Sequence, residues 1–247
     1  MLIEEMEDTK TVRLNKYLAD LGVAARRKIP EVLGQGRVKV NGVVAAGPGQ
    51  RINPDRDEVL LDNKKLSAPQ KIYLALNKPF GIVSTTSDEL GRATIASLVP
   101  RKTRLYPVGR LDKDSTGLII LTNDGQLSNL LSHPRHHLPK TYEVGVTGCA
   151  GEYQLQKLRE GIELKEGRTA PAKVQVTANL PKRTTLEITI WEGRNRQIRR
   201  MCGKVGLTVV SLKRLSIGPV KLGYLKAGQW RELSQAEVEA LIVGYRV

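Results

Sequence analysis

Aromatic residues and cysteine are scarce in this sequence of 247 residues. Phe, Trp and Tyr together make up 4% of it, which is too few for the extended aromatic platforms that bind single-stranded nucleic acid without sequence preference. The two cysteines, Cys149 and Cys202, lie far apart and form no Cys-x-x-Cys pair. This spacing argues against a disulfide framework and against a cysteine zinc site, and it suits a reducing compartment.

Long apolar runs and a secretion signal are also missing. No apolar run approaches the roughly 18 residues that a membrane span needs. The sequence opens with acidic residues, whereas a signal peptide begins with basic and then apolar residues. We therefore expect a cytoplasmic protein that does not enter a membrane.

Positive charge, by contrast, is in large excess. The sequence holds 40 Lys and Arg residues and 25 Asp and Glu residues, which gives a formal net charge of +15. Such a charge is typical of proteins with a polyanionic partner, although it also keeps ordinary basic proteins in solution. The partner that we expect is nucleic acid.

Residues 10–62 are predicted to form a small αβ unit. Apolar residues at helical spacing predict a helix that ends near Gly22, and a second helix should cover residues 25–33. A half-exposed strand over residues 37–40 then leads into Asn41-Gly42, the strongest hairpin signal in the chain.

This unit is strongly basic. Eight cations and two acids lie between Lys10 and Asn41, a density that suits a phosphate-binding face. A pair of solvated, charged helices would show the same pattern. The cations are Lys10, Arg13, Lys16, Arg26, Arg27, Lys28, Arg37 and Lys39.

A polar connector over residues 63–70, which carries a proline, is predicted to precede a larger unit over residues 71–247. Strands and helices of the larger unit do not alternate strictly, which favours an α+β fold with a large mixed sheet over a doubly wound parallel sheet. Strands are expected over residues 71–79, 82–86, 117–122, 141–147, 173–178 and 184–191 and near 207–212. Helices are expected over residues 125–132, 151–160, 195–204 and 234–243.

Three clusters of the larger unit could carry chemistry. In the first, Arg110, Asp112 and Asp114 stand before an apolar run over residues 118–121. A carboxylate in such a place can be a nucleophile, a general base, a metal ligand or half of an ion pair. The Asp-x-Asp spacing is a weak metal signal, because cations flank it and no third acid is near. Taken alone, the cluster favours ion pairing.

The second cluster lies on the strand predicted over residues 141–147. Lys140 and Tyr142 share one face there, because side chains alternate along a strand. A tyrosine that points into a cleft could stack on a base while its hydroxyl takes part in proton transfer. An ordinary half-buried strand tyrosine fits the same pattern.

In the third cluster, arginines crowd the start of the helix predicted over residues 195–204. Cations at a helix N-terminus oppose the positive end of the helix dipole. Their presence makes sense if phosphates or a buried carboxylate supply negative charge. Against one acid, Glu192, the cluster has the cations Arg194, Arg196, Arg199, Arg200 and Lys204.

Three histidines, His133, His136 and His137, raise the question of a metal site. A metal would need a further ligand, and Arg135 is a poor neighbour for a cation. We expect these histidines to form a surface loop near RNA instead.

Residues 10–62 resemble the S4 RNA-binding domain. The resemblance lies in Arg13-Leu14-Asn15-Lys16-Tyr17-Leu18, Ala25-Arg26-Arg27 and Gly36-Arg37-Val38-Lys39-Val40-Asn41-Gly42. The family commonly has serine where this chain has Ala25, and a serine there would cap the second helix. The resemblance implies RNA contacts through Arg13, Lys16, Arg26, Arg27, Lys28 and Lys39.

Taken together, the S4-like unit and the three clusters resemble the ribosomal pseudouridine synthases of types A, B, E and F, of which type A is named for the small ribosomal subunit, the others for the large one. The motifs occur in the family's order and are Leu76-Asn77-Lys78-Pro79, Gly109-Arg110-Leu111-Asp112, Lys140-Thr141-Tyr142 and Glu192-Gly193-Arg194-Asn195-Arg196-Gln197-Ile198-Arg199-Arg200-Met201. Such enzymes isomerise a chosen uridine of RNA without a cofactor or a metal. The segment 192–196 looks closest to the type B branch, which favours 23S over 16S rRNA, free or within a ribosomal assembly intermediate, as the partner.

The resemblance implies a role for each cluster. Asp112 is the essential carboxylate, and Tyr142 stacks on the target uracil and assists proton removal at C5. Arg199 pairs with Asp112 and keeps it ionised, whereas Asp114 has a supporting or solvent-facing place. Arg110 enters the space that the flipped uridine leaves. Lys140 and Leu118 line the pocket, and further RNA contacts come from Arg194, Arg196 and Arg200.

Two other classes of protein stay open at this point. One is a catalytically silent RNA-binding or ribosome-assembly protein, against which an intact set of Asp112, Tyr142 and Arg199 argues. The other is a metal-dependent glycosyl or phosphoryl transferase that uses Asp112 and Asp114. The function that we predict is a monomeric, cofactor-free rRNA pseudouridine synthase.

Overall fold

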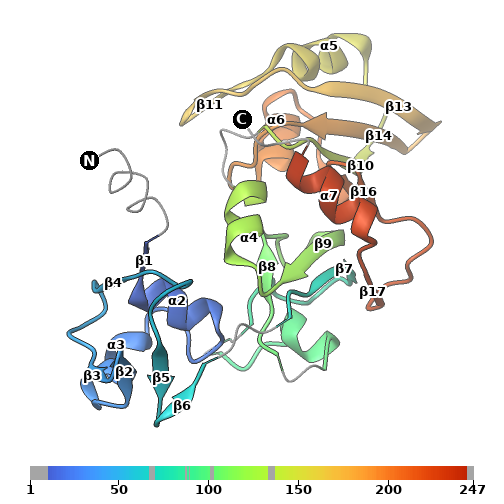
Figure 1. Ribbon diagram of the computed structural model, residues 1–247. Coiled ribbons are helices and arrows are strands. Elements are labelled where there is room, and N and C mark those ends of the chain that lie inside the picture. Colours follow the sequence, from blue (N-terminus) through green and yellow to red (C-terminus); the bar gives the residue numbers. More distant parts are fainter. Residues whose placement is uncertain are drawn as a thin grey trace. The chain divides into compact units, whose positions relative to one another are not determined.

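The computed structural model describes residues 11–66, 70–86, 88, 90–100, 103–132 and 137–243. Contacts divide the chain into two compact units, Met1–Lys71 and Ile72–Val247, called here the N-terminal and the C-terminal unit (Figure 1). The N-terminal unit has one hydrophobic core, and the C-terminal unit has two.

Two short helices pack with a four-stranded antiparallel sheet in the N-terminal unit. The elements are α2 (Leu14–Asp20), α3 (Ile29–Gly34), β2 (Val38–Val40), β3 (Val43–Val44), β5 (Val59–Leu61) and β6 (Lys64–Lys65), with the sheet order β3-β2-β5-β6 and a separate pair of β1 (Val12–Arg13) with β4 (Arg51–Ile52). Leu14, Leu18 and Ile29 are fully buried in its core. The hairpin predicted at Asn41-Gly42 is confirmed, since both residues have the positive φ angles that such turns require and β2 pairs with β3.

Two boundaries in this unit differ from those that the sequence predicts. The second helix begins at Ile29, and residues 26–28 form a turn before it. Pro30 occupies the first helical turn, where its missing N–H removes no helical hydrogen bond. Lys64–Lys65, which the sequence assigns to the connector, form β6 and pair with β5.

The C-terminal unit is built on a nine-stranded mixed sheet. Its strands are β7 (Tyr73–Lys78), β8 (Tyr106–Val108), β9 (Thr116–Thr122), β10 (Lys140–Thr147), β13 (Lys173–Leu180), β14 (Arg183–Ile190), β15 (Val209–Ile217), β16 (Val220–Lys221) and β17 (Trp230–Glu232). They follow the order β13-β14-β10-β15-β9-β7-β17, with β8 on β9 and β16 on β15 (Figure 1). Only β9 with β15 is a parallel pair within this sheet. The predicted α+β class with a large mixed sheet is therefore confirmed.

Side chains that alternate along β9 separate two cores. Leu118 and Ile120 pack with the helices α4 (Gly125–Ser132) and α7 (Gln235–Val243). Ile119 and Leu121 belong to the core that includes α5 (Glu152–Glu160) and α6 (Gln197–Lys204). Because neighbouring side chains of a strand point to opposite faces, helices cover both faces of the sheet.

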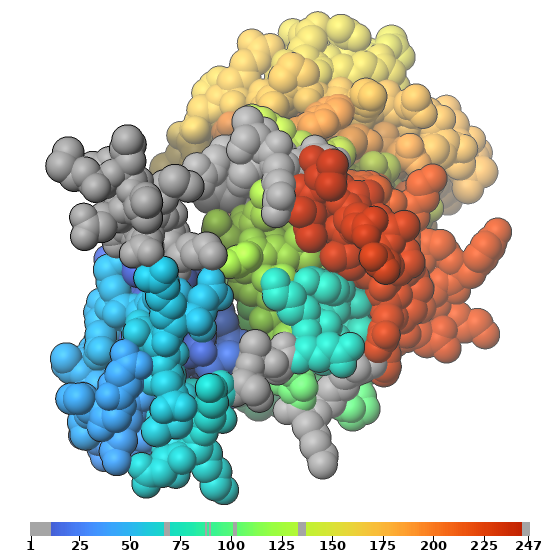
Figure 2. Space-filling model, in the orientation of Figure 1, coloured from blue at the N-terminus to red at the C-terminus, as the bar shows by residue number. Residues whose placement is uncertain are grey.

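Segments from the two ends of the C-terminal unit lie side by side. β17 pairs with β7, so the last strand of the described chain closes the sheet edge next to the first strand of this unit (Figure 1). On the surface, red atoms of the C-terminal part lie beside turquoise atoms from near the start of the unit (Figure 2). A short 3-10 helix (Ile95–Leu98) and a small hairpin of β11 (Glu163–Leu164) with β12 (Gly167–Arg168) complete the unit.

The strand predicted over residues 82–86 is wrong. Within it, Val83 alone makes a bridge, to Thr94. The chain turns at Gly81, whose φ angle is +85°, and Ser84 then uses its side chain on another loop: Ser84 Oγ donates to the carbonyl of Leu111 at 2.7 Å and accepts from its N–H at 3.1 Å. The segment is therefore bound to the loop that carries Asp112 and is not part of the sheet.

No helix in the described part of the chain combines the length and the apolar composition that crossing a bilayer requires.

Candidate active site

The three sequence clusters meet around one cavity of about 440 Å³ in the C-terminal unit. Most of the wall comes from the loop before β9, from β10, from the segment between β14 and α6, and from β15, and the ends of β8, α4 and α6 complete it. The cavity therefore gathers segments that are far apart in the sequence. Of the predicted site residues, those that line it are Arg110, Asp112, Lys140, Tyr142, Arg194 and Arg196.

Three of the site residues predicted for the C-terminal unit are not part of this wall. Leu118 is fully buried in the core with α4 and α7, so its predicted place in the pocket is wrong. Arg199 and Arg200 lie behind the wall on α6 and contact other parts of the chain, which are described below.

A tight turn presents Asp112 to the cavity. The backbone N–H of Ser115 donates to the carbonyl of Asp112 at 3.0 Å, and Ser84 holds both backbone groups of the preceding Leu111. The side chain of Asp112 remains 35% exposed. A carboxylate on a fixed turn with one open side can meet a ligand without rearrangement of the backbone.

The predicted ion pair of Asp112 with Arg199 is wrong. Arg196 is the partner of Asp112, with Nη1 at 3.5 Å from Oδ2. Arg199 instead pairs with the carboxylate of Asp114 at 3.3 Å and donates to its main-chain carbonyl at 3.0 Å. A second hydrogen bond, to the carbonyl of Val209, holds Arg199 in this direction.

Asp114, for which a supporting or solvent-facing role is expected, makes ion pairs with two arginines. It accepts hydrogen bonds from both terminal nitrogens of Arg196, at 3.3 and 3.2 Å, in addition to its pair with Arg199. Partial burial raises the pKa of Asp114, but the hydrogen bond from Arg196 and the charge of Arg199 outweigh this effect and lower it. Asp114 thus ties the turn of Asp112 to the start of α6.

Arg196 reaches both carboxylates from a strained backbone. Its φ angle of +47° lies in the left-handed region, and it is the residue directly before α6. For a residue other than glycine this conformation costs about 1 kcal/mol or more. The sequence points to Arg196 only as an RNA contact, so its link to Asp112 is a feature that sequence reasoning missed.

Tyr142 lies on β10 with its side chain almost fully buried at the wall of the cavity. Arg214 is directly opposite on β15, and its guanidinium carbon lies 6.0 Å from the centre of the tyrosine ring. Sequence reasoning missed Arg214 as well. The available signal was the alternation along residues 209–217, which places Arg214 on the same face as the buried Leu212.

Lys78, from the first motif, is a fully buried cation near the two aspartates. Its Nζ donates to the carbonyls of Pro79 and Ile82 at 3.1 and 2.8 Å. Burial lowers the pKa of Lys78 to about 8; the charges of Asp114 and Asp112 oppose this shift, and that of Arg214 adds to it.

Replacing Lys78 by methionine should remove part of the pH dependence of stability. Between pH 8 and 10 the native protein binds fewer protons at this site than the unfolded chain, so its stability increases as the pH rises. We expect the wild type to gain about 2 kcal/mol over this range relative to Lys78→Met. Urea unfolding at pH 8 and pH 10 measures the difference, and equal changes in both proteins would contradict it.

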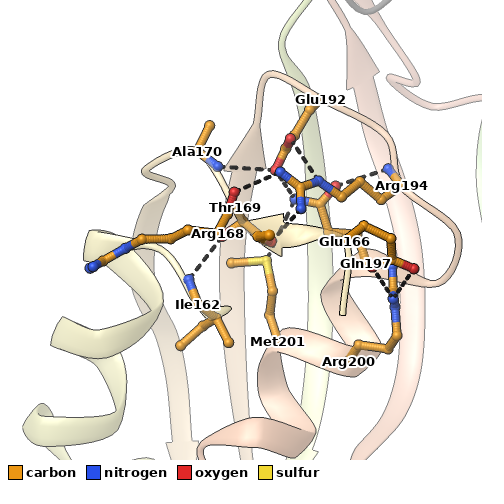
Figure 3. Close-up of polar contacts among 11 residues, drawn as sticks. Ile162, Glu166, Arg168, Thr169, Ala170, Glu192, Arg194, Gln197, Arg200 and Met201 are labelled. Carbon is orange, nitrogen blue, oxygen red and sulfur yellow. Dashed lines mark hydrogen bonds and ion pairs between the residues drawn. The ribbon is translucent and has the colours of Figure 1, made fainter. Parts of the chain in front are cut away.

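A polar network supports the segment between β14 and α6 (Figure 3). Glu192 accepts hydrogen bonds from the side chains of Gln197 at 2.6 Å and Arg194 at 3.1 Å, and from the backbone N–H of Ala170. Arg194 also donates to the carbonyls of Gly167 and Arg168. The network thus joins this wall of the cavity to the β11–β12 hairpin.

Arg200 makes a second link to the same hairpin. Its Nη1 lies 2.8 Å from a carboxylate oxygen of Glu166 (Figure 3). The sequence assigns both Arg194 and Arg200 to RNA binding, but in the structure both donate hydrogen bonds to other residues of the protein.

The cations predicted for the S4-like unit lie on its surface. Arg13, Arg26, Arg27 and Lys28 are exposed, and Lys16 and Lys39 are partly exposed. Lys39 donates to the side chain of Asn63. A surface of this kind can meet phosphates without disturbing the core beneath it.

A metal centre finds no support in the described residues. They include no group of three or more His, Cys, Asp or Glu side chains placed to hold a metal ion. His133 and His136 of the histidine cluster lie outside the described residues.

Comparison with known proteins identifies the class. The sequence model of the RNA pseudouridylate synthases matches residues 72–204, and that of the S4 domain matches residues 12–65. The chain therefore belongs to the RNA pseudouridylate synthase family and carries an S4 domain. It is an RNA pseudouridine synthase.

Three relatives show how far the similarity extends along the chain. An uncharacterized RNA pseudouridine synthase of Aquifex aeolicus is 44% identical over 93% of each chain. The ribosomal large subunit pseudouridine synthase B of Bacillus subtilis is 41% identical over 93% of this chain and 95% of the relative. The ribosomal large subunit pseudouridine synthase E of Vibrio parahaemolyticus is 43% identical over 72% of this chain and 78% of the relative.

A solved structure agrees with this assignment. The crystal structure of a pseudouridylate synthase superposes with a TM-score of 0.68 at 34% identity, over 93% of this chain and 99% of the other. The mixed sheet of the C-terminal unit is therefore the pseudouridine synthase fold.

Proposed function

We propose that this chain converts one uridine of ribosomal RNA to pseudouridine, with 23S rRNA as the substrate in preference to 16S rRNA. The relatives in Bacillus subtilis and Vibrio parahaemolyticus carry large-subunit names, which supports this choice of substrate. The exposed cations of the S4 domain are suited to backbone contacts with folded RNA. The protein acts as a monomer in the cytoplasm.

The observation that carries the proposal is the placement of Asp112 and Tyr142 on one cavity. The isomerisation breaks the bond between N1 of uracil and C1′ of ribose, rotates the uracil and joins C5 to C1′; C5 loses a proton and N1 gains one, so no atom is lost overall. A carboxylate can act here by bonding to C1′ as N1 leaves, or by accepting the proton of C2′. Both routes need an open carboxylate next to the ribose, as Asp112 offers.

Tyr142 and Arg110 have complementary places in this proposal. The ring of Tyr142 forms part of the cavity wall, where it stacks on the uracil during rotation. Its hydroxyl assists proton removal from C5. Arg110 is exposed and also lines the cavity, so it can fill the gap in the RNA stack, which offsets an unstacking cost of about a few kcal/mol.

Arg196 and Arg199 have positioning roles. Arg196 places a positive charge beside Asp112 while leaving one side of the carboxylate open. Arg199 holds the turn through the carboxylate and the carbonyl of Asp114. The reacting group is thereby fixed by two arginines from the start of one helix.

Carbodiimide mapping of pseudouridine in both rRNAs tests the proposal. We expect one position of 23S rRNA to lose its modification in cells that lack this protein. The purified protein should restore it on unmodified RNA in excess EDTA, because no metal takes part. A missing position in 16S rRNA would overturn the choice of substrate, and an unchanged map together with inactivity in vitro would overturn the function.

A further inference from the structure

Two cations that are buried or half-buried at the cavity have no acidic partner among the described residues. Lys140 on β10 and Arg214 on β15 both line the cavity. Their protein hydrogen bonds go to main-chain carbonyls, from Lys140 Nζ to Leu138 at 3.0 Å and from Arg214 Nε to Leu118 at 2.7 Å. Arg196, a third cation of the wall, differs because it is exposed and is paired with Asp112 and Asp114.

Arg214 carries an unsatisfied donor in this position. Its side chain belongs to a residue that is only 3% exposed, and its Nη2 is buried without a hydrogen-bond partner. A buried N–H group without a partner is costly, and a guanidinium stays charged in proteins. The guanidinium also lies over the ring of Tyr142, but a contact with a ring does not replace a hydrogen-bond acceptor for Nη2.

The charge of Arg214 also acts on Lys140. Burial, and then the positive charge of Arg214, lower the pKa of Lys140 to about 8. Two like charges on the wall of one cavity are unfavourable unless an anion shares them. The site is thus complete only when a negatively charged group lies between them.

We infer that Lys140 and Arg214 form a subsite for a phosphate of the target nucleotide. Phosphate is the anionic group of RNA, and the planar donor fork of an arginine fits it well. A uracil carbonyl would satisfy a donor but would leave two positive charges uncompensated. Because Arg214 lies directly opposite Tyr142 across the β10–β15 pair, the uracil can stack on the ring while its own phosphate reaches both cations.

This inference rests on the proposed entry of the target uridine into the cavity, and neutral phosphate analogues test it. The substrate is an RNA fragment that holds the mapped uridine, with a methylphosphonate at either its 5′ or its 3′ phosphate. We expect one of the two substitutions to slow single-turnover pseudouridine formation by the wild type about 10- to 100-fold. Lys140→Gln and Arg214→Gln should slow the reaction on unmodified RNA and then respond little to that same substitution.

Two variants serve as controls. Lys213 precedes Arg214 in the chain but does not line the cavity. Lys213→Gln should therefore react at the wild-type rate and be as sensitive to the methylphosphonate as the wild type. Arg214→Lys replaces Arg214→Gln in the test if the latter does not fold. It retains the positive charge and should therefore keep part of the wild-type sensitivity to the methylphosphonate. The inference is overturned if the wild type tolerates both methylphosphonates, or if Lys140→Gln remains as sensitive as the wild type. A wild type that makes no pseudouridine on unmodified RNA would instead overturn the proposed function.

Discussion

Replacing Asp112 by asparagine should slow pseudouridine formation by at least about 10³-fold. The amide keeps the shape of the side chain but has no negative charge, so it can neither bond to C1′ nor accept the proton of C2′. The side chain is 35% exposed and makes one long contact, of 3.5 Å, with Arg196. Its loss should therefore change the stability by less than about 1 kcal/mol.

Asp114→Asn is the matched control, because Asp114 lies two residues further on and also pairs with Arg196. It should slow the reaction about tenfold by loosening the turn, since Arg199 keeps its hydrogen bond to the main-chain carbonyl of Asp114. The single-turnover rate and the RNA affinity of both variants are measured to show which of the two carboxylates takes part in the reaction. If Asp114→Asn is the slower enzyme, the reacting carboxylate has been assigned to the wrong residue.

Replacing Gly117 by alanine should destabilise the C-terminal unit by about 3–5 kcal/mol. The φ angle of Gly117 is +99°, in a region that residues with a Cβ rarely adopt. An added Cβ would lie 2.6 Å from the backbone nitrogen of Arg214 and closer still to its carbonyl oxygen. Because both obstacles are backbone atoms, β9 and β15 would have to separate at their parallel pair.

Gly203→Ala provides the control for this prediction. Gly203 is exposed on α6, and an added Cβ there would have nothing within 4 Å. Alanine is the better helix former, so this variant should be unchanged or more stable by up to about 1 kcal/mol. Urea unfolding followed by circular dichroism compares the two variants. Equal urea midpoints for Gly117→Ala and the wild type would contradict the predicted clash at this position.

The sequence predicted which residues meet at the cavity better than it predicted how they pair. Arg110, Asp112, Lys140 and Tyr142 come from short motifs whose place on a turn or a strand is fixed locally, and all four line the wall. The pair of Asp112 with Arg199 was expected from the family resemblance alone. The predicted helix starts at residue 195, two residues before α6, and would give Arg196 a helical backbone. Arg196 instead has a left-handed backbone directly before α6 and reaches Asp112 from there, and an arginine side chain gives no sequence signal for this conformation.

Arg214 was missed because its strand was predicted to end too early, so the alternation that continues to residue 217 was not used. The sequence places a strand near residues 207–212, whereas β15 extends to Ile217. The added residues are held by pairing with β10, β9 and β16. β10 and β9 lie far away in the sequence, and β16 is a two-residue strand without a sequence pattern of its own. Short strands such as β8, β16 and β17 depend on their partners in the same way.

The parallel pairing of β9 with β15 also has a consequence for when the enzyme can work. Leu118 and Arg214, which this pairing brings into hydrogen-bond contact, are 96 residues apart in the chain. Contacts across such long separations close a large loop and form slowly. During synthesis, most of the C-terminal unit therefore emerges from the ribosome before β15 can pair with β9 and form the cavity. The chain becomes active only when its last third has folded.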